Sequence, residues 1–147
     1  MTQLEALKAI AERNGGLLRP QTVVDEARPE DSPLHNVFEW DDGVAAEKYR
    51  LDQAQRLIRS FRITKQDSSG REIEVPVFVG VSIDRTNGKA ENPYRLIESI
   101  QNCPDLMEVA VKDALDQLEG IRNRHSHLTE LRDVWDAIDR HTRKRRK

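Results

Sequence analysis

The sequence predicts an α+β protein, mainly α, with a helix-turn-helix or winged-helix-like module that carries a β-hairpin, followed by a long helix or helical hairpin. Three observations predict this class. Apolar residues recur at helical spacing in several segments, the alternation typical of strands is concentrated between residues 62 and 83, and glycine or proline separates the segments. A chain of 147 residues, 37% of them hydrophobic, is long enough to bury a core.

Two short amphipathic helices are predicted at the N-terminus. Residues 2–14 carry apolar side chains at helical spacing, and Gly15-Gly16 ends the pattern as a C-terminal cap would. A second helix of about nine residues is expected to begin near Pro20 and to end at Pro29. Their short connection is that of a helix-turn-helix pair, although any small helical hairpin gives the same pattern.

Residues 28–40 contain two prolines and are predicted to form an ordered loop. The loop is too apolar for a solvated connection, since it contains Leu34, Val37, Phe38 and Trp40. We expect it to pack back onto the core, and a surface that docks a partner is the alternative.

A third helix is predicted from a cap at Asp41 or Asp42 to about Phe61, because its acids come early and its bases late, as the helix dipole favours. The predicted buried stripe consists of Ala45, Tyr49, Ala54, Leu57, Ile58 and Phe61. The predicted solvent side carries Lys48, Asp52, Gln55, Arg56 and Arg59.

A β-hairpin is expected next, with strands over residues 62–65 and 73–83 and a turn at 66–70. Pro76 cannot donate a ladder hydrogen bond and indicates an edge strand or a bulge. A second turn is predicted at Asn87-Gly88, after which residues 94–97 either return as a third strand or begin a helix.

Residues 104 to about 140 are predicted to be helical, with apolar residues in the three-four alternation of a helix that packs along another helix. The segment either projects as a coiled coil or folds back near residues 120–126, and we expect it to mediate homo-oligomerisation. The predicted division is an N-terminal module over 1–84, a C-terminal oligomerisation region over 85–139 and a basic tail over 140–147.

Charge is distributed unevenly along the chain. Six of the 24 basic residues lie in the last eight positions, which leaves 18 basic against 26 acidic residues before them, a net charge of −8. A tail of this composition is either disordered and attracted to polyanions such as nucleic acid, or the solvated end of a helix whose dipole the cations complement.

The sequence contains no phosphate-binding glycine loop, nucleotide fingerprint or Ser-His-Asp arrangement, so no enzyme activity and no cofactor are predicted. No metal site is expected, because His125 and His127 point in opposite directions on a helix. Cys103 is predicted to be a small buried residue at a helix start, with a reactive thiol as the alternative. We expect neither a membrane span nor a secretory signal.

The order of helices, charged third helix and hairpin is that of a winged helix, in which the third helix enters the major groove of DNA. The predicted groove residues are Lys48, Gln55, Arg56 and Arg59, and the predicted phosphate contacts are Arg62, Lys65 and Arg71. Tail residues Arg143, Lys144, Arg145, Arg146 and Lys147 complete the predicted nucleic-acid-binding set. Four acids in or next to the third helix make it neutral overall, so a purely structural helix is the alternative.

The segment SPLHNVFEWDD at 32–42, followed by AAEKYRLDQAQRLIRS at 45–60, resembles small proteins of tailed bacteriophages and prophages. The stretches VFVGVSID at 77–84 and LEGIRNRHSHLTEL at 118–131 are similar to the same proteins, whereas the basic tail has no counterpart there. The resemblance implies a phage setting, in the host cytoplasm or in the virion. Two functions are therefore predicted. The first is a non-enzymatic, regulatory protein that binds double-stranded DNA. The alternative is a structural or assembly protein of the virion that binds phage structural proteins.

Overall fold

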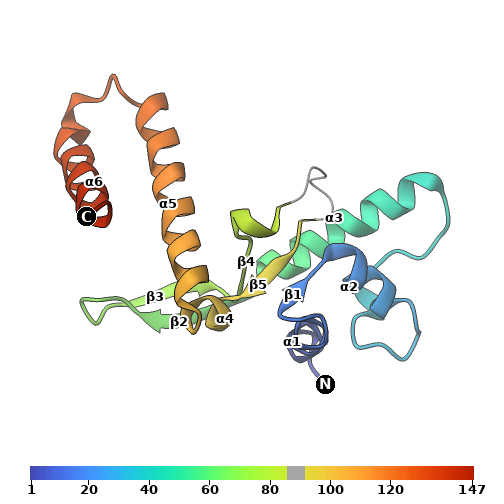
Figure 1. Cartoon of the computed structure of the whole chain (residues 1–147). Coiled ribbons are helices and arrows are strands. Elements are labelled where there is room, and N and C mark those ends of the chain that lie inside the picture. The colour runs from blue at the N-terminus through green and yellow to red at the C-terminus, as the bar shows by residue number, and fades with distance from the viewer. Residues whose placement is uncertain (86–91) are drawn as a thin grey trace.

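A computed structural model describes residues 1–85 and 92–147 and confirms a mainly helical α+β fold with two small antiparallel sheets. Figure 1 shows the first three helices and the strands gathered in one body, from which a C-terminal pair of helices projects.

Helix α1 (Gln3–Arg13) confirms the first predicted helix. A capping box holds its start, because the Thr2 hydroxyl accepts from the Glu5 N–H while the Glu5 carboxylate accepts from the Thr2 N–H. Its end is followed by Gly15 and Gly16 at φ values of 65° and 83°, a backbone region that glycine adopts without steric cost.

Helix α2 (Pro20–Ala27) begins at the predicted proline and confirms the second helix. The connection before it contains a strand that sequence reasoning missed, β1 (Leu17–Leu18). This strand pairs with β5 (Tyr94–Leu96), with Leu17 opposite Arg95. A partner so distant along the chain leaves no local signal in two leucines.

Helix α3 (Val44–Ser60) confirms the third helix but corrects its start. Gly43 is the N-cap residue and no side chain caps the helix, so neither Asp41 nor Asp42 plays the predicted role. The Asp42 carboxylate is engaged elsewhere, because it accepts a hydrogen bond from Arg50.

The predicted buried stripe of α3 is partly wrong. Ala54 and Ile58 are fully buried, and Leu57 and Phe61 pack partly against the core. Tyr49, in contrast, is 48% exposed, and the side chain of Ala45 lies outside the described residues.

Strands β2 (Arg62–Gln66) and β3 (Glu72–Pro76) form the predicted hairpin. The turn between them is closed by the Asp67 carboxylate, which accepts from the backbone N–H groups of Ser69 and Arg71, both at 2.9 Å. Gly70 has a φ of 79°, which explains the glycine at this place in the turn.

Val77 is the point at which the chain passes from one sheet to the other. Its N–H donates to the carbonyl of Phe61 at 3.1 Å, and its carbonyl accepts from the N–H of Ile97 at 2.9 Å. Strand β4 (Phe78–Val79) then pairs with β5, giving the three-stranded order β1-β5-β4.

The second predicted strand, which was expected to reach residue 83, ends at Val79 instead. Residues Ser82–Asp84 form a 3₁₀ turn. Two contacts hold this turn: the Ser82 N–H donates to the Asp113 carboxylate at 2.8 Å, and the Asp84 carboxylate accepts two hydrogen bonds from Arg95 of β5, at 2.6 and 2.8 Å.

Both predicted alternatives for residues 94–97 are realised in succession. The strand β5 ends at Leu96, and a short helix α4 (Ile97–Gln101) begins at the next residue. The predicted turn at Asn87-Gly88 lies outside the described residues. The predicted module boundary at residue 84 falls between strands of one sheet, since β5 pairs with both β1 and β4.

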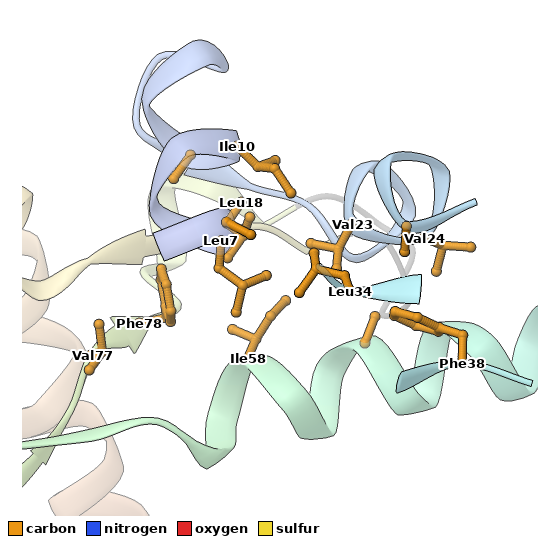
Figure 2. Packing of buried hydrophobic residues seen from close by; sticks show 14 residues of the cluster. Leu7, Ile10, Leu18, Val23, Val24, Leu34, Phe38, Ile58, Val77 and Phe78 are labelled. Carbon is orange, nitrogen blue, oxygen red and sulfur yellow. The ribbon is translucent and has the colours of Figure 1, made fainter. Parts of the chain in front are cut away.

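The core lies between α1, α2, α3 and the strands (Figure 2). Leu34 and Phe38 are buried in it, which confirms that the loop at 28–40 packs back onto the core. The buried hydrophobic cluster consists of Ala6, Leu7, Ile10, Ala11, Leu18, Val23, Val24, Ala27, Leu34, Phe38, Ala54, Ile58, Val77 and Phe78.

The C-terminal segment folds back on itself, as one predicted alternative has it. Helix α5 (Pro104–Arg124) is followed by a connection that includes a 3₁₀ turn (Thr129–Leu131) and by helix α6 (Arg132–Arg145). The basic residues at 140–145 continue α6, so the solvated helix end describes this part of the tail and a disordered tail does not.

Replacing Ile58 by alanine should lower the free energy of unfolding by about 2–5 kcal/mol, because the side chain is fully buried and its loss leaves a cavity. Urea unfolding followed by circular dichroism measures the change. Ile83→Ala is the matched control, since Ile83 is 66% exposed and its replacement should cost no more than about 0.5 kcal/mol. Equal losses in the two variants would contradict this assignment of the core.

Candidate nucleic-acid interface

α3 turns one side to the core and the opposite side to solvent. On the solvent side four charged side chains are exposed, and at about 100° per residue they fall within an arc of about 80°. These four are Lys48, Asp52, Arg56 and Arg59, and Gln55 at the edge of the arc is half-buried. The predicted solvent side is thus confirmed for the four charged residues and only in part for Gln55, and we call these five residues the outer face of α3.

Arg50 lies on the inner side of α3, where its side chain is only 4% exposed. Its Nε donates to the Glu39 carbonyl at 2.6 Å, and its terminal nitrogens donate to Asp42 at 3.2 Å and to Glu47 at 3.4 Å. The guanidinium carbon lies 5.1 Å from the centre of the Trp40 ring, within cation–π range. These partners explain how a charged group is accommodated inside the molecule.

Trp40 connects this arginine to the end of α2. Its ring stacks on His35 at a centroid distance of 5.1 Å, and its Nε1 donates to the His35 carbonyl at 2.9 Å. The Nδ1 of His35 lies 3.0 Å from the carbonyl oxygen of Ala27. The Arg28 guanidinium carbon also lies 5.7 Å from the centre of the Trp40 ring. The loop is therefore tied to both helices by rings and hydrogen bonds.

Glu47 provides a second link between α2 and α3. Its carboxylate accepts from Gln21 at 3.0 Å, from Arg28 at 3.2 Å and from Arg50 at 3.4 Å. The hydrogen bond from Gln21, followed by the charge of Arg28 and the hydrogen bond from Arg50, lowers the pKa of Glu47 below its ordinary value of 4.5, against the opposing effect of partial burial. Glu47 is thus held as an anion by the contacts that fix α3.

These contacts change the charge balance of α3. Asp42 and Glu47 offset the basic residues in the sequence, but in the fold both pair with the buried Arg50, and the Asp42 side chain itself stays 91% exposed. The outer face then has three cations and one carboxylate, that of Asp52, and a net charge of +2. Across residues 1–85 and 92–147, none of the three outer-face cations is engaged in an ion pair.

The hairpin supplies some of the other predicted cations. Arg62, at the start of β2, and Arg71, in the turn, are exposed. Lys65 is half-buried, and its Nζ donates to the side chain of Gln101 in α4 at 2.7 Å. Lys65 therefore holds the hairpin against α4, whereas Arg62 is exposed two residues beyond the end of α3.

The predicted tail cations lie apart from α3. They are exposed on and after the last turn of α6, which Figure 1 places at the opposite end of the view from the start of α3. The structure thus divides the predicted site into two groups. One follows α3 and the hairpin, and the other consists of Arg143, Lys144, Arg145, Arg146 and Lys147.

Sequence reasoning missed two residues of this region. Tyr49 was predicted to be buried, and it is exposed beside the outer face. Arg50 was not assigned a role, and it is buried between α3 and the loop at 28–40, where it donates to Glu39, Asp42 and Glu47. The sequence signal for Arg50 is indirect: an arginine one helical turn after Glu47 and close to Trp40 has the partners that a buried guanidinium group needs.

Other chemistry is limited in the part of the chain that the structure describes. No group of three or more histidine, cysteine, aspartate or glutamate side chains could hold a metal ion there. Cys103 is half-buried at the N-cap of α5 rather than fully buried. Among these same residues, no helix combines the length and apolar character needed to cross a bilayer.

No protein-family model, curated protein or solved structure matches this chain. The resemblance to phage proteins therefore stays a prediction.

Replacing Arg50 by lysine should lower the free energy of unfolding by about 1.5–3 kcal/mol, because one ammonium group cannot reproduce the three directed hydrogen bonds of the guanidinium group. Urea unfolding measures the loss. The matched control is Arg56→Lys on the outer face, which should change stability by no more than about 0.5 kcal/mol. A control that destabilises as much as Arg50→Lys would show that burial of Arg50 has no special role.

The lowered pKa of Glu47 predicts a stability change in acid. Its folded pKa lies below the ordinary value, so ionisation of Glu47 stabilises the fold above pH 4.5, and this contribution is lost as the pH falls from 4.5 through the folded pKa. The stability difference between wild type and Glu47→Gln should shrink over this range. Carboxyl NMR titration should also show the pKa of Glu47 rising in Gln21→Ala, and an unchanged pKa would refute the assigned cause.

Proposed function

We propose that this chain is a non-enzymatic, phage-encoded protein that binds double-stranded DNA through the outer face of α3. One observation carries the proposal: Asp42 and Glu47 pair with Arg50 rather than with the outer-face cations, which leaves the outer face of α3 with a net positive charge. The neutral total charge of the helix is the main objection that the sequence raises to DNA binding. Pairing of these acids with Arg50 weakens that objection, because a DNA phosphate is attracted by the charge of the face that it contacts.

The dimensions of α3 suit the major groove. Its 17 residues span about 25 Å at 1.5 Å per residue, and an α-helix fits the width of the groove. Arg56 and Arg59 can each bridge the two acceptors of a guanine, and Gln55 can bridge those of an adenine. Lys48, without a rigid fork, suits a phosphate.

The β2–β3 hairpin follows α3 directly, as the wing follows the recognition helix in winged-helix proteins. Arg62 and Arg71 are exposed and suit contacts to the DNA backbone. Lys65 is a weaker candidate than predicted, because it already donates to Gln101. The tail cations would add attraction that does not depend on sequence, from a separate part of the molecule.

A structural or assembly role in the virion is the second candidate, and Tyr49 favours it. An exposed tyrosine beside arginines is a composition typical of protein interfaces, in which both residue types are enriched. This role predicts that the protein is retained in purified particles and that duplex binding is absent.

The test is a titration of labelled duplex DNA with the full-length protein, followed by fluorescence anisotropy, between about 50 and 200 mM salt. Binding should weaken steeply with salt. Arg56→Ala and Arg59→Ala should each reduce the binding free energy by about 1–3 kcal/mol where they contact bases. Asp52→Asn should strengthen binding, since it removes the one carboxylate of the outer face.

Arg13→Ala is the matched control, because it removes one exposed positive charge from α1 in the same body. It should leave affinity close to that of wild type. A second variant replaces the cations at 143–147 by glutamine, which preserves helix propensity. Loss of binding in this variant alone, with Arg56→Ala and Arg59→Ala unaffected, would overturn the role of α3 and indicate nonspecific attraction by the tail.

A further inference from the structure

The α5–α6 hairpin is unusually open for a pair of amphipathic helices. Neither helix has a fully buried side chain among the residues that the structure describes. Figure 1 shows only the beginning of α5 against the rest of the molecule, with α6 standing alongside α5 and away from the core. An amphipathic helix normally buries its apolar stripe, so this hairpin has a face that the described part of the chain leaves uncovered.

That face is a groove of about 670 Å³ along one side of the hairpin. Four of its residues recur on α6 at the spacing of one helix face, and two come from α5. They are Val134, Ala137, Ile138, His141, Leu115 and Leu118. Val134 is 48% exposed, and Asp133 forms the charged rim of the groove.

The hairpin is held in shape without this face. Arg122 of α5 donates to both carboxylate oxygens of Asp139 in α6, at 2.8 and 3.3 Å. The hydrogen bond from Arg122 lowers the pKa of Asp139, which keeps the carboxylate ionised. The groove is therefore a preformed surface, and a partner need not reorganise the two helices to reach it.

Charge along the hairpin changes sign from end to end. The end nearest the body, residues 104–113 and 140–147, has seven basic and three acidic residues, a net charge of +4. The end that contains the connection, residues 114–139, has three basic and six acidic residues, a net charge of −3. A hairpin of this kind is complementary to a second copy of itself placed in the opposite direction.

We propose that the groove is covered by the same groove of a second copy, in an antiparallel four-helix bundle with two-fold symmetry. The two-fold axis makes one surface serve both partners, so the apolar stripes meet at the centre and each positive end lies against a negative end. An arrangement with the hairpins side by side in the same direction would place +4 against +4 and −3 against −3, which like-charge repulsion disfavours.

The test measures the mass of the full-length protein by light scattering and sedimentation equilibrium. Wild type should have a mass twice the 16.9 kDa of the chain. Val134→Asp should be monomeric, because it places a carboxylate in the centre of the proposed interface. The matched control is Ile83→Asp, which adds the same charge at a 66% exposed isoleucine outside the groove and should stay dimeric. Circular dichroism of each variant should match wild type, so that a lost dimer is not mistaken for an unfolded chain.

Charge reversal tests the direction of packing. The double variant Arg140→Glu and Arg143→Glu should raise the dimer dissociation constant by about tenfold or more in the antiparallel bundle, whereas it would tighten a parallel one. The reciprocal variant Asp133→Lys and Asp136→Lys should also weaken the dimer, and an equimolar mixture of the two should restore it.

A monomeric wild type, a dimer that survives Val134→Asp, an open-ended series of larger species, or tighter association of the Arg140→Glu and Arg143→Glu variant would each overturn the proposal. The inference does not rest on DNA binding, because Arg56→Ala and Arg59→Ala leave the hairpin unchanged and should keep the wild-type mass.

Discussion

The guanidinium group of Arg50 lies between the loop and α3, and the orientation of α3 depends on its contacts. It binds the backbone of the loop through Glu39 and lies against the ring of Trp40, which is itself tied to the end of α2 through His35. A charge in this position is stable only while every donor has a partner, so the loop, α2 and α3 must take up one arrangement together. These polar contacts add to the apolar packing of the three segments in the core and fix them relative to one another.

The same contacts decide which charges face outward. Burial of Arg50 requires anions nearby, and Asp42 and Glu47 supply them. The contacts that stabilise Arg50 therefore also keep these two carboxylates away from the cations of the outer face. The segment on which the predicted resemblance to phage proteins rests has a structural role. Phe38 and Trp40 pack in or against the core, and His35 stacks on Trp40.

The two ends of the chain obey different constraints. The N-terminal body buries most of its large apolar side chains, and Val77 lies between its two sheets, where its N–H donates to Phe61 next to β2 and its carbonyl accepts from Ile97 next to β5. The C-terminal hairpin is closed mainly by the Arg122–Asp139 pair and leaves apolar residues such as Val134 uncovered. The body therefore presents a charged surface, the outer face of α3, whereas the hairpin presents an exposed apolar groove.

Local physical chemistry made much of the fold predictable from the sequence. Helix periodicity, Gly15-Gly16 after α1, Pro20 at the start of α2 and the turn near Gly70 act within a few residues, so α1, α2 and the hairpin follow from the chain. The fold-back of the C-terminal segment was only one of two predicted alternatives. The four charged residues of the outer face of α3 were also predicted correctly, because charged residues at helical spacing lie together on the solvent side of a helix.

Only the tertiary structure decided which of two adjacent residues, Tyr49 or Arg50, is buried. By periodicity Tyr49 belongs inside and Arg50 has no clear place, yet Arg50 is buried and Tyr49 is exposed because the partners of Arg50 come from a loop that folds over it. The pairing of β1 with β5 depends likewise on contacts across most of the chain. The sequence by itself determined the main helices, the hairpin and their order. The long-range contacts determined the three-stranded sheet and the burial of Arg50, because the partners in each come from other segments of the chain.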